Sequence, residues 1–297
     1  MPRPPTMPGL PTTAGGWLAC FRYRLKTTKG LPSSPEQVAA DLGVSGDTMR
    51  RWETDRAIPT DSDLRRFAQK CELTATEESF LFKAFAPVNI ESGPNEDAFR
   101  RMTAQVLALG IPAYLYDSLF YVRAWNSYID LVYDRPLEPQ GEHIVERVLE
   151  DPPRYPQPPN LWSTRQERAE WWLRDFWYET AQMCGSVPYQ RVIERLAVNN
   201  PSFVERWKGL GLLHRPAGEL PIGSPKLRVD PERGTYMLLT SAVLIPPMYF
   251  LHVYCPVDEI AWERLKLRRS LGEARVETSF LLHWSEAGLD SPTDPPA

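Results

Sequence analysis

The segment 35–54, PEQVAADLGVSGDTMRRWET, limits the possible folds more than any other part of the 297-residue chain. Two short helices that cross at a steep angle need a small residue where their backbones approach, and Ala39 lies at that position. Gly43 stands where the turn requires unusual backbone dihedrals. Met49 and Trp52 are three residues apart and therefore share the inner face of the second helix. The pattern predicts a helix-turn-helix.

The second of these helices carries the candidate DNA contacts. Ser45 can cap its N-terminus, and Asp47 lies in its first turn, where the helix dipole favours an acidic side chain. In a helix-turn-helix the second helix enters the major groove, where arginine can bond guanine bidentately or bind phosphate. The predicted DNA-binding residues are Ser34, Ser45, Gly46, Asp47, Thr48, Arg50, Arg51, Thr54 and Arg56. The alternative is a helical hairpin with a solvated arginine face.

Residues 15–86 resemble the Cro/CI repressor family, also called the xenobiotic-response-element type, in the DLGVS turn and the pair Trp52 and Glu53. The resemblance implies double-stranded DNA as a partner. It also implies five short helices, near 15–27, 34–42, 46–54, 61–71 and 75–86. The family usually has glutamine as the first residue of its second helix, and this chain has Pro35 there. Proline suits a first helical turn but removes that contact, which Ser33 or Ser34 could replace.

The charge of the chain differs from that of a typical nucleic-acid binder. The net charge is −4, and within residues 15–86 eleven basic side chains face ten acidic ones. No bulk electrostatic footprint therefore supports DNA binding, which depends instead on where individual arginines lie. We expect modest non-specific affinity and a homodimer that supplies useful specific affinity.

Composition and spacing argue against several other classes of protein. No apolar run reaches the length of a transmembrane helix, and the first residues lack the apolar core of a signal peptide. The four cysteines lie far apart without metal-ligand spacing, so buried free thiols are expected. The four histidines are equally scattered, and the chain has no HExxH or paired-carboxylate motif. We predict a cytoplasmic protein that is not an enzyme and holds no metal and no cofactor.

Beyond residue 110 the periodicity of apolar residues changes. Residues 111–125 are rich in β-forming residues and are broken at Asp117 and Ser118, which indicates two adjacent strands joined by a turn. Helices are expected at 142–150, 161–184, 188–198, 201–209 and 257–271, and further strands at 226–229, 236–245 and 249–255. The predicted fold class is α+β, with an all-α five-helix domain followed by an antiparallel sheet covered by helices.

The motifs PAYLYD, VRAWN, PSFVERW and HVYCPVDE, in this order, resemble the MmyB-like ligand-binding domain. That domain is PAS-like, and its members are thought to bind a small hydrophobic molecule, for example a fatty acid, between sheet and helices. The predicted domains are a disordered tail at 1–14, the helix-turn-helix domain at 15–86, a linker and connecting helix at 87–110, the PAS-like domain at 111–271 and a C-terminal extension at 272–297.

Aromatic residues of the second domain could line a cavity with a few hydroxyl groups, as is typical of small-molecule sites. The predicted ligand-binding residues are Tyr114, Tyr116, Trp125, Tyr128, Trp172, Phe176, Phe203, Trp207 and Tyr254. The alternative is that these side chains fill the core. Three functions stay open: a DNA-binding regulator that senses a small apolar molecule, a DNA-binding regulator whose second domain only dimerises or docks a partner, and an interaction protein that does not bind DNA.

Overall fold

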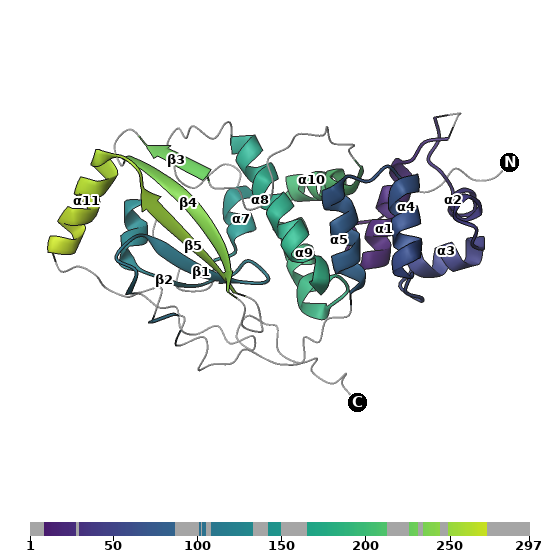
Figure 1. The fold of residues 1–297 in the computed structure, drawn as a ribbon, viewed down its shortest axis with the longest axis horizontal. Helices are drawn as coiled ribbons and strands as arrows, with labels where there is room; N and C mark the ends of the chain where they lie inside the picture. Colours follow the sequence, from purple (N-terminus) through teal and green to yellow (C-terminus); the bar gives the residue numbers. More distant parts are fainter. Residues whose placement is uncertain are drawn as a thin grey trace. The chain divides into compact units, whose positions relative to one another are not determined.

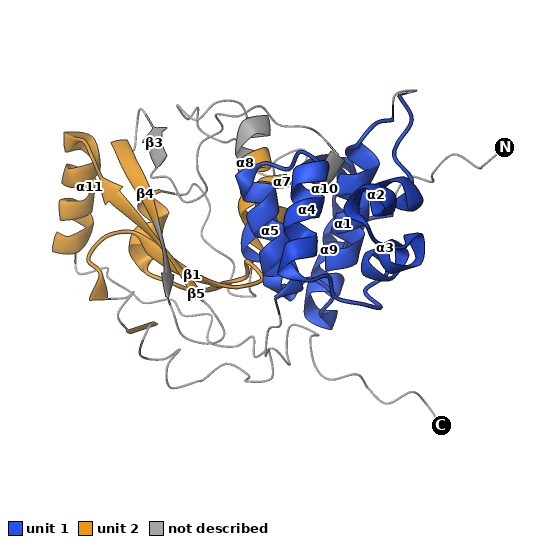
Figure 2. Ribbon diagram, turned by 45° about the vertical axis from the view of Figure 1, so that its right-hand side comes forward, with its two compact units in different colours: residues 1–88, 177–220 blue, residues 89–176, 221–297 orange. Residues whose placement is uncertain are grey.

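The computed structural model describes residues 9–27, 30–86, 101, 103–104, 108–132, 142–149, 165–212, 226–230, 234–243 and 249–271. These residues belong to two compact units, which Figure 2 shows in different colours. Residues 1–88 and 177–220 form the first unit, and residues 89–176 and 221–297 form the second. The chain is α+β, because the N-terminal unit is helical and the second contains an antiparallel sheet (Figure 1).

Five helices occupy the N-terminal part of the first unit, close to where the sequence predicts them. They are α1 (Ala14–Arg24), α2 (Pro35–Leu42), α3 (Gly46–Glu53), α4 (Asp61–Lys70) and α5 (Ala75–Phe85). The first ends three residues earlier than predicted, and Lys26 instead pairs with Pro32 in an isolated antiparallel bridge.

Local hydrogen bonds explain where α2 and α3 begin and end. Ser34 caps α2 in a reciprocal capping box with Gln37, and Pro35 takes the first helical position, where its missing N–H costs nothing. Gly43 ends α2 with a left-handed φ of 69°. Ser45 then caps α3 by accepting a hydrogen bond from the backbone N–H of Thr48 at 3.0 Å. The sequence 34–54 therefore determines the helix-turn-helix largely through its own caps and turn.

Helices from later in the chain complete the core of the first unit. They are α9 (Val187–Asn199) and α10 (Pro201–Leu212), which follow the short helix η2 (Ala181–Met183). Trp17 of α1 packs edge-on against Trp207 of α10 and against Trp177, and Trp177 stacks on Phe80 with ring centres 4.1 Å apart. The sequence prediction places residues 177–212 in the second domain, whereas their contacts assign them to the first unit.

The predicted disordered tail at 1–14 extends too far into the chain. Pro11 is buried, and its carbonyl oxygen accepts a hydrogen bond from the indole N–H of Trp207 at 3.1 Å. The carbonyl oxygen of Thr12 accepts another from the backbone N–H of Gly185 at 2.8 Å. Residues 11–14 therefore belong to the packed first unit.

The second unit is built on a five-stranded antiparallel sheet. Its strands are β1 (Ala113–Asp117), β2 (Val122–Trp125), β3 (Lys226–Asp230), β4 (Gly234–Val243) and β5 (Tyr249–Pro256), in the spatial order β2-β1-β5-β4-β3. As predicted, β1 and β2 form a hairpin around the turn after Asp117. The carboxylate of Asp117 accepts hydrogen bonds from the backbone N–H groups of Leu119 and Tyr121. It also forms an ion pair with Arg123, in which Oδ2 and Nη2 are 2.6 Å apart. These contacts shape the turn.

The two faces of β1 and β5 differ in character. Ala113 and Leu115 lie on one face, in an apolar cluster with Ala124. Tyr114 and His252 are register partners on the other face. The described helices of this unit include η1 (Ser127–Leu131), α7 (Ile144–Leu149), α11 (Glu259–Ser270) and most of α8 (Arg165–Glu179). Most of the predicted linker at 87–110 and all of the extension at 272–297 lie outside the described residues.

Candidate nucleic-acid interface

The second helix of the helix-turn-helix, α3, has one buried face and one exposed face. Met49 and Trp52 are buried in the core, as predicted. Arg50, Arg51 and Thr54 are exposed on the rest of the helix. The amphipathic arrangement leaves the two arginines available to a macromolecular partner.

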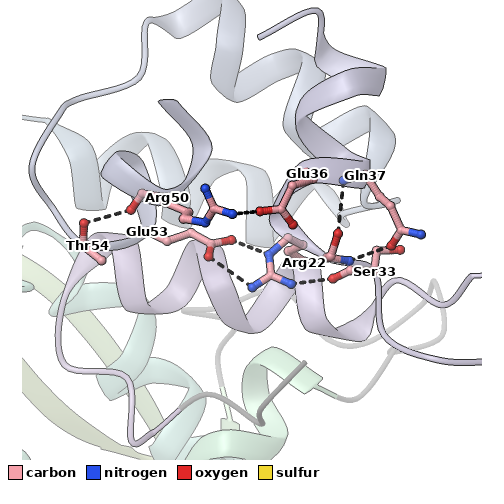
Figure 3. A network of polar contacts seen from close by, with 8 residues as sticks. Arg22, Ser33, Glu36, Gln37, Arg50, Glu53 and Thr54 are labelled. Carbon is pink, nitrogen blue, oxygen red and sulfur yellow. Dashed lines mark hydrogen bonds and ion pairs between the residues drawn. The ribbon is translucent and has the colours of Figure 1, made fainter. Parts of the chain in front are cut away.

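A buried ion pair holds α3 against α1. Arg22, in the last turn of α1, binds the carboxylate of Glu53 through two guanidinium nitrogens, and the Nη2–Oε2 distance is 3.1 Å. Nη1 of Arg22 also donates to the carbonyl oxygen of Ser33, just before α2 (Figure 3). The side chains of Arg22 and Glu53 are only 7% and 10% exposed, so solvent screens the pair little. One guanidinium therefore joins α1, α3 and the segment that leads into α2.

The backbones of α1 and α3 also meet directly. A Cβ atom on Gly15 would lie 2.3 Å from the carbonyl oxygen of Trp52, so only glycine fits there. The backbone N–H of Gly15 donates to Oδ1 of Asp55 at 2.8 Å, and Asp55 has a left-handed φ of 57°. These contacts fix the C-terminal end of α3.

The predicted DNA-binding residues lie on or next to α3, except for Ser34 at the start of α2. Several of their hydroxyl groups already make helix-capping bonds. The hydroxyl oxygens of Ser34 and Ser45 each accept a hydrogen bond from a backbone N–H group three residues later. Oγ1 of Thr54 donates to the carbonyl oxygen of Arg50 at 2.8 Å. Ser45, Asp47, Arg50, Arg51, Thr54 and Arg56 are exposed, and Ser34, Gly46 and Thr48 are half-buried. The arginines are therefore the strongest candidates for contacts with DNA.

Glu36 is a further member of this surface that the sequence analysis does not identify. Its carboxylate forms an ion pair with the guanidinium of Arg50. The capping box at Ser34 and Gln37 would have placed Glu36 in the first turn of α2. It would not have shown that this side chain reaches across to α3, because that contact depends on how the two helices cross.

Seven of the predicted ligand-binding residues lie in the second unit, and all are buried. They are Tyr114, Tyr116, Trp125, Tyr128, Trp172, Phe176 and Tyr254. The other two, Phe203 and Trp207, lie in the first unit on α10, stacked on each other with ring centres 5.2 Å apart. The nine predicted residues are therefore divided between the two compact units.

His252 is the polar centre of the aromatic residues in the second unit. Its Nδ1 lies 2.5 Å from the hydroxyl oxygen of Tyr114, and its Nε2 lies 3.1 Å from that of Tyr116. The ring of Trp172 is 5.3 Å away, and His252 is fully buried. In the sequence His252 is one of four scattered histidines, and only the register of β1 and β5 reveals its two tyrosine partners.

Two properties of the described residues bear on function. No described helix is both long and apolar enough to cross a membrane. Within the same residues, no group of three or more histidine, cysteine, aspartate or glutamate side chains could hold a metal ion.

Burial raises the pKa of the Cys20 and Cys71 thiols to about 12, which makes them poor nucleophiles.

Comparison with known proteins bears on the first unit. No curated protein sequence matches the chain. Residues 24–81, which run from the last residue of α1 into α5, match a family model described as a helix-turn-helix domain. The match agrees with the capped α2–turn–α3 arrangement and supports a DNA-binding regulator of the helix-turn-helix type.

Proposed function

We propose that the chain is a sequence-specific transcription regulator that binds double-stranded DNA as a homodimer through α3. The observation that carries this proposal is a helix-turn-helix whose second helix, α3, exposes Arg50 and Arg51. The ion pair between Arg22 and Glu53 fixes this helix against α1. An arginine can make a bidentate contact with guanine that discriminates by about 1–3 kcal/mol. A dimer would place two such helices in successive major grooves, about 34 Å apart.

The test starts with selection of bound sequences from a randomised duplex library by the full-length protein. Binding to the selected site is then measured at an ionic strength of about 0.15 M. Arg50→Ala/Arg51→Ala should weaken binding roughly a hundredfold, if each arginine contributes about 1.4 kcal/mol. The far-UV circular dichroism should not change, because both side chains are exposed.

A matched control removes two positive charges elsewhere in the same unit. Arg65 and Lys70 are exposed on α4, so Arg65→Ala/Lys70→Ala changes the net charge equally without altering α3. Equal weakening in both double variants would show that only total charge matters. No selected sequence at all with the wild-type protein would favour an interaction protein that does not bind DNA.

For the second unit we propose a PAS-like sensor domain of the MmyB-like type, which responds to a small hydrophobic ligand such as a fatty acid. Support comes from the buried Tyr114–His252–Tyr116 cluster among aromatic side chains. Small-molecule sites commonly combine an apolar lining with a few polar groups. The competing proposal is that these side chains only fill the core and the domain serves dimerisation or partner docking.

Native mass spectrometry of the purified full-length protein separates the two proposals. A bound apolar molecule should add a discrete mass that organic extraction releases for identification. Tyr114→Phe/Tyr116→Phe should reduce that bound fraction while the protein stays folded. A protein that carries no added mass, and whose melting temperature is unchanged by added fatty acids, would favour the docking proposal.

A further inference from the structure

Glu36 places a negative charge on the surface that we propose for DNA. It belongs to α2, and its Oε1 is paired with Nη2 of Arg50 on α3. Figure 3 shows the two side chains pointing toward each other across the helix-turn-helix. Both are about half exposed, at 51% for Glu36 and 57% for Arg50. An acid at this position weakens attraction to phosphates, so a surface that served only general DNA binding would not benefit from it.

Gly46 provides the space in which Glu36 reaches Arg50. A Cβ atom on Gly46 would lie 3.1 Å from Cγ and 3.7 Å from Oε1 of Glu36. Gly46 is the first residue of α3, and Arg50 follows it by four residues on the same face. The side chain of Glu36 therefore passes beside Gly46, and this contact limits the directions in which its carboxylate can point.

The carboxylate of Glu36 is held in its charged form. A hydrogen bond from its own backbone N–H is the largest influence and lowers the pKa, and Ser34 and Arg50 lower it further against the opposing effect of desolvation. Glu36 also lies in the first turn of α2, where the helix dipole favours negative charge. The ion pair is therefore present at neutral pH.

The pair leaves Arg50 able to bind a base. An arginine side chain has five N–H donors in a planar fork, and the carboxylate of Glu36 engages the Nη2 group. The remaining donors stay in a plane whose direction the carboxylate helps to set. An exposed ion pair adds at most about 1 kcal/mol to folding, so its main effect need not be on stability.

We propose that Glu36 is a positioning residue, which orients the guanidinium of Arg50 toward one base pair and so sharpens sequence discrimination without touching DNA itself. This inference rests on the proposed function. It predicts an effect confined to the base pair that Arg50 reads, whereas a purely electrostatic role would change affinity for every sequence alike.

The experiment uses the full-length protein, a selected site and duplexes that carry each single base-pair substitution of that site. Arg50→Ala identifies the base pair whose preference depends on Arg50. Glu36→Ala should reduce the preference at that base pair about tenfold and leave the other positions unchanged. Glu36→Gln, which keeps the size and one acceptor, should give an intermediate loss. In the Arg50→Ala background, Glu36→Ala should cause no further loss there.

Asp41→Ala is the matched control. Asp41 is another exposed acid of α2, paired with Lys70 at 2.7 Å, so its removal changes the charge equally without affecting Arg50. This variant should keep the wild-type base preferences. An unchanged preference in Glu36→Ala at the Arg50-dependent base pair, or an equal change at all positions, would overturn the inference while leaving the proposed function intact. Failure of the wild-type protein to select any sequence would instead refute the proposed function and this inference with it.

Discussion

The substitution Glu53→Gln tests whether the buried ion pair with Arg22 holds α3 in place. It keeps the size of the side chain and one acceptor oxygen, but it removes the charge that balances Arg22. Neutralising one partner of a buried pair costs about 3–5 kcal/mol, because the other charge stays buried without compensation. The carbonyl oxygen of Ser33 still accepts a hydrogen bond from Arg22, so we expect the lower end, about 3 kcal/mol.

Amide hydrogen exchange in α1 and α3 measures this loss locally, which matters because the chain has two compact units. A loss of about 3 kcal/mol corresponds to exchange that is roughly a hundredfold faster. Glu36→Gln is the control, because it makes the same chemical change in a pair whose partners are about half exposed. That control should cost no more than about 1 kcal/mol.

The reasoning depends on the difference between the buried and the exposed pair. Equal exchange rates in the two variants would refute it, because burial would then not determine the cost. The variant Arg22→Met/Glu53→Leu provides a second check. It leaves neither charge unpaired and should recover part of the stability lost in Glu53→Gln.

Two further predictions concern close contacts elsewhere. Gly15→Ala would push a methyl group against the carbonyl oxygen of Trp52 and should lower stability by about 1–3 kcal/mol in thermal unfolding, whereas Gly9→Ala, with no atom within 4 Å, should not. Desolvation raises the pKa of Asp258, but hydrogen bonds from Thr235 and Ala261 outweigh this effect and lower the pKa below the ordinary value of 3.8. The charged carboxylate therefore stabilises the folded chain at pH values above 3.8. This stabilisation is lost as the pH falls through the lower pKa of the folded state. Urea unfolding at a series of acidic pH values should therefore show a steeper loss for the wild-type protein than for Asp258→Asn, and parallel curves would contradict this.

The helix-turn-helix was predictable because its signals are local. Ser34, Pro35, Gly43 and Ser45 act within four residues of the helix ends that they define, as the observed caps and turn show. The inner face of α3 follows from the spacing of Met49 and Trp52 alone. Such signals need no knowledge of the tertiary structure. For the same reason the strands of the second unit could be assigned from their β-forming residues.

Contacts between distant segments could not be predicted in this way. A stripe of aromatic residues shows that a helix face is buried, but it does not say which element covers it. Trp207 lies nearly two hundred residues from Pro11 in the sequence, yet its indole N–H bonds the carbonyl oxygen of Pro11. The contacts of Arg22 with Glu53 and of Glu36 with Arg50 likewise depend on how helices cross.

The near-neutral charge of residues 15–86 is compatible with DNA binding once the positions of these charges are known. Arg22 and Arg24 are neutralised inside the fold by Glu53 and Glu77 and contribute little to the surface. Among the described residues, the exposed arginines Arg51 and Arg56 form no ion pair, and both lie in or just after α3. Lys26 and Arg65 are also exposed and form no ion pair among the described residues, so α3 carries part of the positive charge that remains available. If α3 binds DNA as we propose, the near-neutral charge predicts weak general affinity for phosphates, and the orientation of each guanidinium toward the bases then matters more for discrimination than the net charge.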